Sequence, residues 1–120
     1  MADKESIYDE GLDLAFDGDF AGAIEKYRAA LAIDPANVDA VHALAMAHKE
    51  RGELDAAIAA GCRLCELAPD DILAHTSLSQ FYQMAGLIAE AEAEAAKAKV
   101  LDWKRQLAEQ KEAGQGDGKG

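Results

Sequence analysis

The sequence predicts an all-α protein, a right-handed α-solenoid of three helix–turn–helix repeats that ends in an extended C-terminal capping helix. Three observations predict this fold class. Half of the 120 residues are hydrophobic but only 6% are aromatic, and alanine dominates, which favours closely packed helices over sheets. Glycines recur every 34 residues, at Gly18, Gly52 and Gly86. Small residues and prolines repeat in the same register, so the chain is organised as copies of one unit.

The recurring glycines and prolines mark where the helices end. A glycine just after a helix adopts the left-handed conformation that closes it, so each of the three glycines is expected to end a first helix. Pro35 and Pro69 also lie 34 residues apart, and they lack the backbone donor that a continuing second helix needs. The small residues that let paired helices approach are Gly11, Ala45 and Ser79 on the first helices and Ala23, Ala57 and Ala91 on the second.

These markers divide the chain into repeats 4–37, 38–71 and 72–105. The third repeat has Trp103 where the proline is expected, and no glycine or proline lies between Gly86 and Gly114. The last helix is therefore expected to run from about Ile88 to about residue 113, as the polar cap that a solenoid needs at its end. This division gives one domain, 1–113, followed by a flexible Gly-rich tail, 114–120.

The repeat resembles the tetratricopeptide repeat (TPR) family. That family carries a large residue, Leu, Gly and Tyr on the first helix, then Ala, an aromatic residue, Ala and Pro on the second. The matching residues are Ile7, Gly11, Leu14, Gly18, Phe20, Ala23, Tyr27, Ala30 and Pro35 in repeat one, Val41, Leu44, Ala45, Gly52, Leu54, Ala57 and Pro69 in repeat two, and Leu78, Tyr82, Gly86, Ala91 and Ala98 in repeat three. The resemblance implies that the first helices line a concave groove in which a peptide or a helix of another protein lies.

Repeat two departs from the family pattern on its second helix. Gly61 stands where an aromatic residue is expected, and Leu64 stands where an alanine is expected. We expect the missing volume to have moved one turn along this helix, as a volume-conserving exchange.

A helical wheel separates the core face of each first helix from its opposite face. The opposite faces hold large apolar side chains, although a merely solvated surface would be charged, and this indicates a binding surface. The candidate partner-binding residues are Tyr8, Leu12, Phe16, Asp39, His42, Met46, Lys49, Leu73, Thr76, Gln80 and Met84. Ser77 and Gln83 share the face of repeat three. Two alternatives stay open, namely self-association through this face and simple packing against the last helix.

The charge of the groove face predicts the kind of partner. The acidic residues on these faces are Glu5, Asp9, Asp39 and Glu50, which favour an apolar segment with basic flanks. Members of the family that bind C-terminal carboxylate tails use Lys, Asn and Arg residues as a clamp. The matching positions here hold Tyr8, Leu12, Ala43, Leu73 and Ser77. None of them matches, so a C-terminal carboxylate tail is not the expected ligand.

Composition and charge exclude several classes of function. The formal net charge of −11, without a basic stripe, opposes nucleic-acid binding. No run of about 18 apolar residues is present, so no membrane span is expected. The charged start lacks the apolar stretch of a secretory signal, which predicts a cytoplasmic protein. Two cysteines are too few for a secreted disulfide framework.

No constellation in the sequence predicts catalysis, a cofactor or a metal. The C-x-x-C string at Cys62 and Cys65 falls inside a helix and has no second cysteine pair, so we expect both thiols to pack as small residues. His48 is expected to pack in the core, and His42 faces the groove. No nucleophile is paired with a base, and no glycine-rich phosphate loop is present, so we expect no enzyme.

The sequence therefore predicts a protein–protein interaction module, or adaptor, whose groove binds a segment of a partner. The alternative is a self-assembling scaffold that forms homo-oligomers through the groove or through the last helix, which carries Leu101, Trp103 and Leu107. A weaker third hypothesis is a thiol or metal sensor at Cys62 and Cys65.

Overall fold

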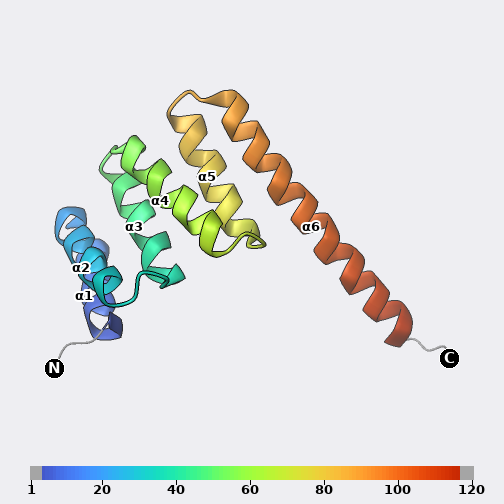
Figure 1. Ribbon diagram of the computed structural model, residues 1–120, viewed down its shortest axis with the longest axis horizontal. Coiled ribbons are helices and arrows are strands. Elements are labelled where there is room, and N and C mark those ends of the chain that lie inside the picture. The colour runs from blue at the N-terminus through green and yellow to red at the C-terminus, as the bar shows by residue number, and fades with distance from the viewer. Residues whose placement is uncertain (1–3, 117–120) are drawn as a thin grey trace.

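The computed structural model describes the backbone of residues 4–116 and the side chains of residues 6–113. The described part consists of helices joined by short turns. The helices are α1 (Lys4–Phe16), α2 (Phe20–Ile33), α3 (Val38–Glu50), α4 (Leu54–Leu67), α5 (Ile72–Met84) and α6 (Ile88–Gly116). Helix pairs α1–α2, α3–α4 and α5–α6 stack in a row, and each pair packs on the next through α2 against α3 and α4 against α5 (Figure 1). This arrangement confirms the predicted all-α solenoid.

The turn inside each helix pair is built in the same way three times. Gly18, Gly52 and Gly86 have φ angles of 87°, 74° and 79°, which side chains other than glycine rarely tolerate. The residue after each glycine donates its backbone N–H to a carbonyl five residues earlier, as in Asp19 to Leu14 at 2.8 Å. Such bonds satisfy carbonyls at the end of a helix that would otherwise lack a partner. The glycine register therefore predicted these turns correctly.

The turns that join successive helix pairs also provide a polar cap for the first turns of α3 and α5. The side chain of Asn37 accepts a hydrogen bond from the Ala40 N–H at 3.2 Å, and that of Asp71 accepts one from the Leu73 N–H at 3.0 Å. These caps satisfy donors at the first turn of α3 and α5. With Pro35 and Pro69 just upstream, they fix where the next repeat begins.

The core contains three clusters, of which the second and third both lie among α3, α4 and α5. The buried residues of the first are Ala23, Ile24, Tyr27 and Ala47, those of the second are Ala45, Ala57, Ala60 and Phe81, and those of the third are Val41, Leu64 and Ala74. The space beside Gly61 is filled from the neighbouring helix, because a Cβ there would lie 3.1 Å from Leu78 and 3.2 Å from Phe81. The expectation that Leu64 supplies this volume on the same helix was wrong.

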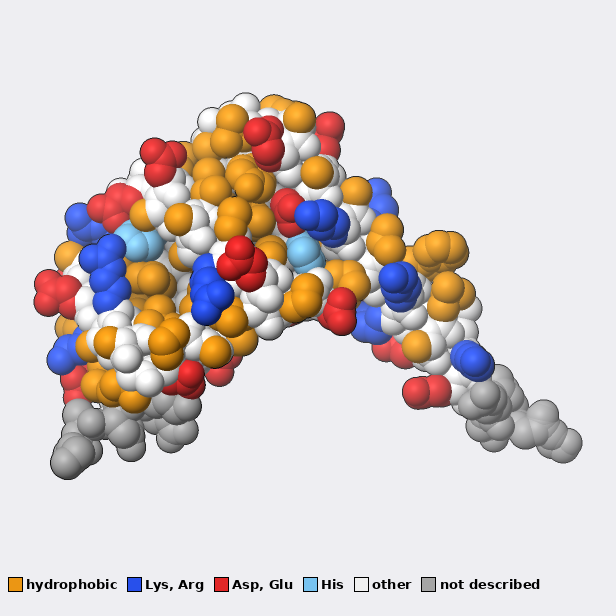
Figure 2. Space-filling view, viewed as in Figure 1, with side chains coloured by type: hydrophobic (Ala, Val, Ile, Leu, Met, Phe, Trp, Pro, Cys, Tyr) orange, Lys and Arg blue, Asp and Glu red, His pale blue; other side chains and the backbone are white. Residues whose placement is uncertain are grey.

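Helix α6 continues past the other helices and projects from the stack (Figure 1). It ends at Gly116, so the first three residues of the expected flexible tail are helical, and 117–120 lie outside the described residues. Figure 2 shows hydrophobic side chains gathered over the middle of the molecule and continuing along α6 among lysines and arginines. Within residues 4–116, no helix has the length and apolar character needed to cross a membrane.

Candidate functional site

A groove of about 480 Å³ lies where α3, α5 and α6 meet. Its lining combines apolar side chains with hydroxyl and amide groups. The lining residues are His42, Met46, Leu73, Thr76, Ser77, Ser79, Gln80, Gln83, Ala95 and Ala98. Five candidate partner-binding residues lie together here, namely His42, Met46, Leu73, Thr76 and Gln80. Because α3 and α5 present equivalent faces, residues 34 apart in the repeat register reach the same surface.

The other candidate residues lie outside this groove. Tyr8 is half-buried, and its ring centre lies 5.8 Å from that of Tyr27, so it also packs in the first core cluster. Lys49 is paired with Glu50 at 3.4 Å. Leu12 and Phe16 of α1 are exposed, Phe16 by 92%. The remaining two, Asp39 and Met84, are exposed on α3 and α5.

Helix α6 supplies the wall of the groove that the sequence did not predict. Ala95 and Ala98 come from this helix, and buried Ser79 donates a hydrogen bond from its hydroxyl to the Ala91 carbonyl at 2.7 Å, which ties α5 to α6. The repeat register could have indicated this wall, because Ala95 occupies the position of Tyr27 and Gly61. Its small side chain leaves the groove open at that point.

His42 brings an unsatisfied polar atom to the groove. Its Nε2 is buried and has no hydrogen-bond partner within the described part of the chain. A buried polar atom without a partner costs free energy, so a ligand that supplies the missing hydrogen bond gains affinity there. The groove thus offers this ring nitrogen for a directional contact, beside the hydroxyl and amide groups of its lining.

Acidic side chains surround the α1 end of the same face. The pKa of Tyr8 is raised above 10.0, first by burial and then by the negative charges of Asp39 and Asp9. This shift reports that both carboxylates lie close to Tyr8, on the side of the molecule where the groove faces of α1 and α3 adjoin. A basic group on a ligand would be attracted to this position.

Comparison with known proteins gives the same fold. The tetratricopeptide repeat family matches residues 16–60. The structure titled "Crystal structure of MamA" superposes with a TM-score of 0.83 at 27% identity, covering 87% of this chain and 61% of that chain. The chain has the tetratricopeptide repeat (TPR) fold. No curated protein matches it.

Other similar structures show the TPR fold at lower identity. The second TPR of Spaghetti (RPAP3), bound to the HSP90 peptide SRMEEVD, has a TM-score of 0.76 at 22% identity, with 82% of this chain and 91% of that chain covered. The type III secretion translocator chaperone SycD of Yersinia enterocolitica has a TM-score of 0.76 at 18% identity, with 82% and 73% covered. This chain spans 61% and 57% of the two MamA chains that it matches first.

The protein has a second cavity, of about 610 Å³, that shares no lining residue with the groove. It lies between α4, the start of α5 and α6, and Cys62, Cys65, His75 and Lys97 are among its lining residues. Both cysteines are free thiols. Burial, followed by the charge of Glu94, raises the pKa of Cys65 to about 11, so this thiol is protonated at neutral pH.

Two further polar pairs lie in the described part of the chain, near the second cavity and in the core. The Cys62 thiol contacts the Tyr82 hydroxyl at 3.6 Å, a hydrogen bond that, with burial, raises the pKa of Tyr82 to about 12. His48 is buried and hydrogen-bonds through Nδ1 to Glu53 at 2.9 Å, which confirms its predicted place in the core. Neither pair has the linked nucleophile, base and orienting group that catalysis needs.

Proposed function

We propose that this protein is a non-catalytic adaptor that binds one segment of a partner protein in the groove between α3, α5 and α6. The observation that carries the proposal is the groove itself, in which apolar side chains lie beside polar ones and the Nε2 of His42 is unsatisfied. A side chain or backbone group of the partner would complete that hydrogen bond, and the apolar lining would bury the rest of the segment.

The comparisons support a role in protein binding. One similar structure is described as bound to an HSP90 peptide, another as a complex of CopN with Scc3, and a third as a secretion chaperone. These chains share 18–22% identity with this one, so they support the use of the fold and not a particular partner. A carboxylate tail is not the proposed ligand, because the matching positions hold Tyr8, Leu12, Ala43, Leu73 and Ser77.

The proposed ligand is an apolar segment, helical or extended, with basic residues on its flank. The formal net charge of −11 and the carboxylates of Asp9 and Asp39 beside Tyr8 attract such a segment and repel an acidic one. Free thiols and the absence of a disulfide framework fit a reducing compartment, and we propose the cytoplasm.

A matched pair of variants tests the groove. Leu73, in the groove, and Ile33, outside it, are each 55% exposed, so Leu73→Arg and Ile33→Arg make the same change at equal exposure. A partner captured by the parent chain and identified by mass spectrometry is titrated against all three proteins by calorimetry. We expect Leu73→Arg to bind at least about tenfold more weakly and Ile33→Arg to bind like the parent. Equal binding by all three proteins would refute the groove.

A second candidate function, self-assembly through α6, rests on a separate observation. Val100, Trp103 and Leu107 are 48%, 62% and 46% exposed, and their spacing places them on one side of the projecting helix. Light scattering over a range of concentrations tests it, with Trp103→Glu as the variant and Lys104→Glu as the control. A molar mass that rises with concentration in the parent chain and in Lys104→Glu, but not in Trp103→Glu, supports this function. A parent chain that stays monomeric at every concentration eliminates it.

A further inference from the structure

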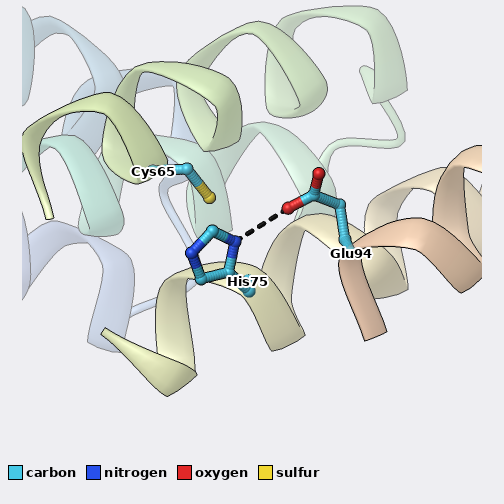
Figure 3. A group of neighbouring side chains, drawn as sticks. All are labelled: Cys65, His75 and Glu94. Carbon is cyan, nitrogen blue, oxygen red and sulfur yellow. Dashed lines mark hydrogen bonds and ion pairs between the residues drawn. The ribbon is translucent and has the colours of Figure 1, made fainter. Parts of the chain in front are cut away.

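Three side chains from three helices meet beside the second cavity. Cys65 comes from α4, His75 from α5 and Glu94 from α6, and their sulfur, ring nitrogen and carboxylate oxygen atoms lie within 4.8 Å of one another. In Figure 3 the ring of His75 and the carboxylate of Glu94 point toward each other, and the sulfur of Cys65 points toward the pair. His75 and Glu94 are buried, whereas Cys65 is half-buried.

The hydrogen bonds around His75 determine which ring atom faces the cluster. Its Nε2–H donates to the Pro69 carbonyl at 2.7 Å, because a carbonyl oxygen can only accept. The other ring nitrogen, Nδ1, therefore faces Oε1 of Glu94 at 2.8 Å. Without a cation between them, the lone pair of Nδ1 and the carboxylate would repel each other. A proton must therefore lie between them in the metal-free protein, and at 2.8 Å the two atoms are joined by a hydrogen bond.

Hydrogen bonds to neighbouring groups orient two of the three side chains of the cluster. A metal-binding histidine almost always donates its second ring N–H to a carbonyl or a carboxylate, as His75 does to Pro69. Lys97 Nζ donates to Oε2 of Glu94 at 2.9 Å, which orients the carboxylate and leaves Oε1 toward the ring. The adjoining cavity of about 610 Å³ gives an ion a route in and room for a water ligand.

We propose that Cys65 Sγ, His75 Nδ1 and the Glu94 carboxylate form a binding site for a divalent transition-metal ion of the zinc class, with water as the fourth ligand. Thiolate, imidazole and carboxylate are the groups that zinc selects, and three of them with one open position complete a tetrahedral set. Magnesium and calcium, which prefer oxygen ligands, do not fit this donor set.

Binding exchanges two protons for one ion. The S–H bond of Cys65 breaks and a metal–sulfur bond forms, while the proton between Nδ1 and Oε1 leaves as the metal binds the ring nitrogen. Both protons pass to solvent through the cavity. A thiol, an imidazolium and a carboxylate sum to zero charge, and so do a thiolate, an imidazole, a carboxylate and a divalent ion. Binding therefore leaves the net charge of the three ligands and the ion unchanged, and no reductant or oxidant is required.

Titration of the metal-free protein with Co²⁺ tests the site. Co²⁺ bound to a thiolate gives a sulfur-to-metal charge-transfer band, and Zn²⁺ added afterwards should abolish it. Cys65→Ser removes the sulfur with little change in volume, and Cys62→Ser makes the same change one turn away, at a thiol that lines the same cavity. We expect the band in the parent chain and in Cys62→Ser, and its loss in Cys65→Ser with at least about tenfold weaker binding.

The opposite results overturn the proposal. If the parent chain shows no band, no thiolate site exists. If Cys62→Ser loses the band as fully as Cys65→Ser does, the ion is held by the C-x-x-C string and not by the three helices. Calorimetry in buffers of different ionisation enthalpy gives a second measurement, because binding through Cys65 and His75 releases protons, whereas an adventitious site of exposed carboxylates releases none near neutral pH.

Discussion

The two interfaces between successive repeats differ in which helix carries the large side chain. The earlier repeat supplies it at the first interface, and the later repeat supplies it at the second. Where repeat one meets repeat two, Tyr27 of α2 packs in one cluster with the small Ala47 of α3. Where repeat two meets repeat three, Gly61 of α4 lies against Phe81 of α5. Tyr27 and Gly61 share one register position, as Ala47 and Phe81 share another. The repeat therefore conserves the summed volume of an interface, while the residue at each position is free to change.

The position of Leu64 on the second helix of repeat two gives further evidence that volume is shared between neighbouring helices. Leu64, which stands where an alanine is expected, is buried with Val41 and Ala74 in the third cluster and not beside Gly61. An aromatic ring missing from one helix is thus replaced by an aromatic ring from the next helix. A solenoid tolerates such exchanges because each repeat contacts only its neighbours.

Truncation of the aromatic ring at the second interface should have the largest effect. Phe81 is fully buried, so Phe81→Ala opens a cavity beside Gly61 and should lower the free energy of unfolding by about 3–5 kcal/mol. The midpoint of urea unfolding, monitored by circular dichroism, gives the value. Leu87→Ala, at a residue that is 41% exposed, serves as the control and should change stability by about 0.5 kcal/mol or less. A loss as small as that of the control would show that Phe81 does not fill this interface.

Reversal of the large and small residues tests the comparison directly. Gly61→Phe alone should overpack the interface and cost about 1–3 kcal/mol. Combined with Phe81→Ala, it recreates the arrangement of Tyr27 and Ala47, and part of the loss should be recovered. A double-mutant cycle should give a favourable coupling of about 0.5–3 kcal/mol. Strict additivity of the two changes would mean that volume is not shared across the interface.

Substitution by alanine should have different effects at the two glycines that lie against aromatic rings, Gly11 and Gly61. A Cβ at Gly11 would lie 2.5 Å from the ring of the buried Tyr27, whereas a Cβ at Gly61 would lie 3.1 Å from Leu78 and 3.2 Å from Phe81. We expect Gly11→Ala to cost about 1–2 kcal/mol after the gain in helix propensity and Gly61→Ala to cost less than about 1 kcal/mol. Urea midpoints in the reverse order would mean that the ring of Tyr27 moves aside more easily than that of Phe81.

The fold was predictable because the signals that define it are local and recur along the sequence. Gly18, Gly52 and Gly86 fix the turns by backbone conformation alone, so their register located the turn inside each helix pair. The helical wheel assigned Met46 and Leu73 to the faces of α3 and α5 that line one groove. The repeat register could not predict which of two neighbouring helices carries the large side chain at their interface, since both arrangements satisfy the same pattern.

The cluster of Cys65, His75 and Glu94 could not be predicted for a different reason. Its members lie 10 and 19 residues apart on three helices, a spacing that matches no local metal motif. Only the packing of α4 and α6 against α5 brings them together. The alanines that α6 adds to the groove were missed on the same ground, because their role depends on where the last helix docks.

Acid should produce the smallest of these effects, and at the first interface it acts through Glu53. Glu53 lies at the surface there, and hydrogen bonds from His48 and then Arg51 lower its pKa below the ordinary 4.5. Arg28 of α2 and Asp55 of α4 line the same surface depression. A carboxyl group whose pKa is lowered by folding stabilises the protein at pH values above its pKa in the unfolded state. This contribution is lost as the pH falls through its pKa in the folded state. The difference in free energy of unfolding between the parent chain and Glu53→Gln (the stability gap) should therefore be constant near neutral pH. It should disappear as the pH falls below 4.5.

The size of this gap should be slight, because Glu53 is 42% exposed and water screens its charge. Urea midpoints measured at neutral pH and in steps below 4.5 provide the test, with Glu66→Gln, at another exposed carboxylate, as the control. The control removes an exposed carboxylate that pairs only with Arg63, at 3.6 Å, among the described ion pairs. A Glu53→Gln gap that persists at acid pH would show that the carboxylate closes the turn by its shape, and that its charge contributes nothing to the first interface.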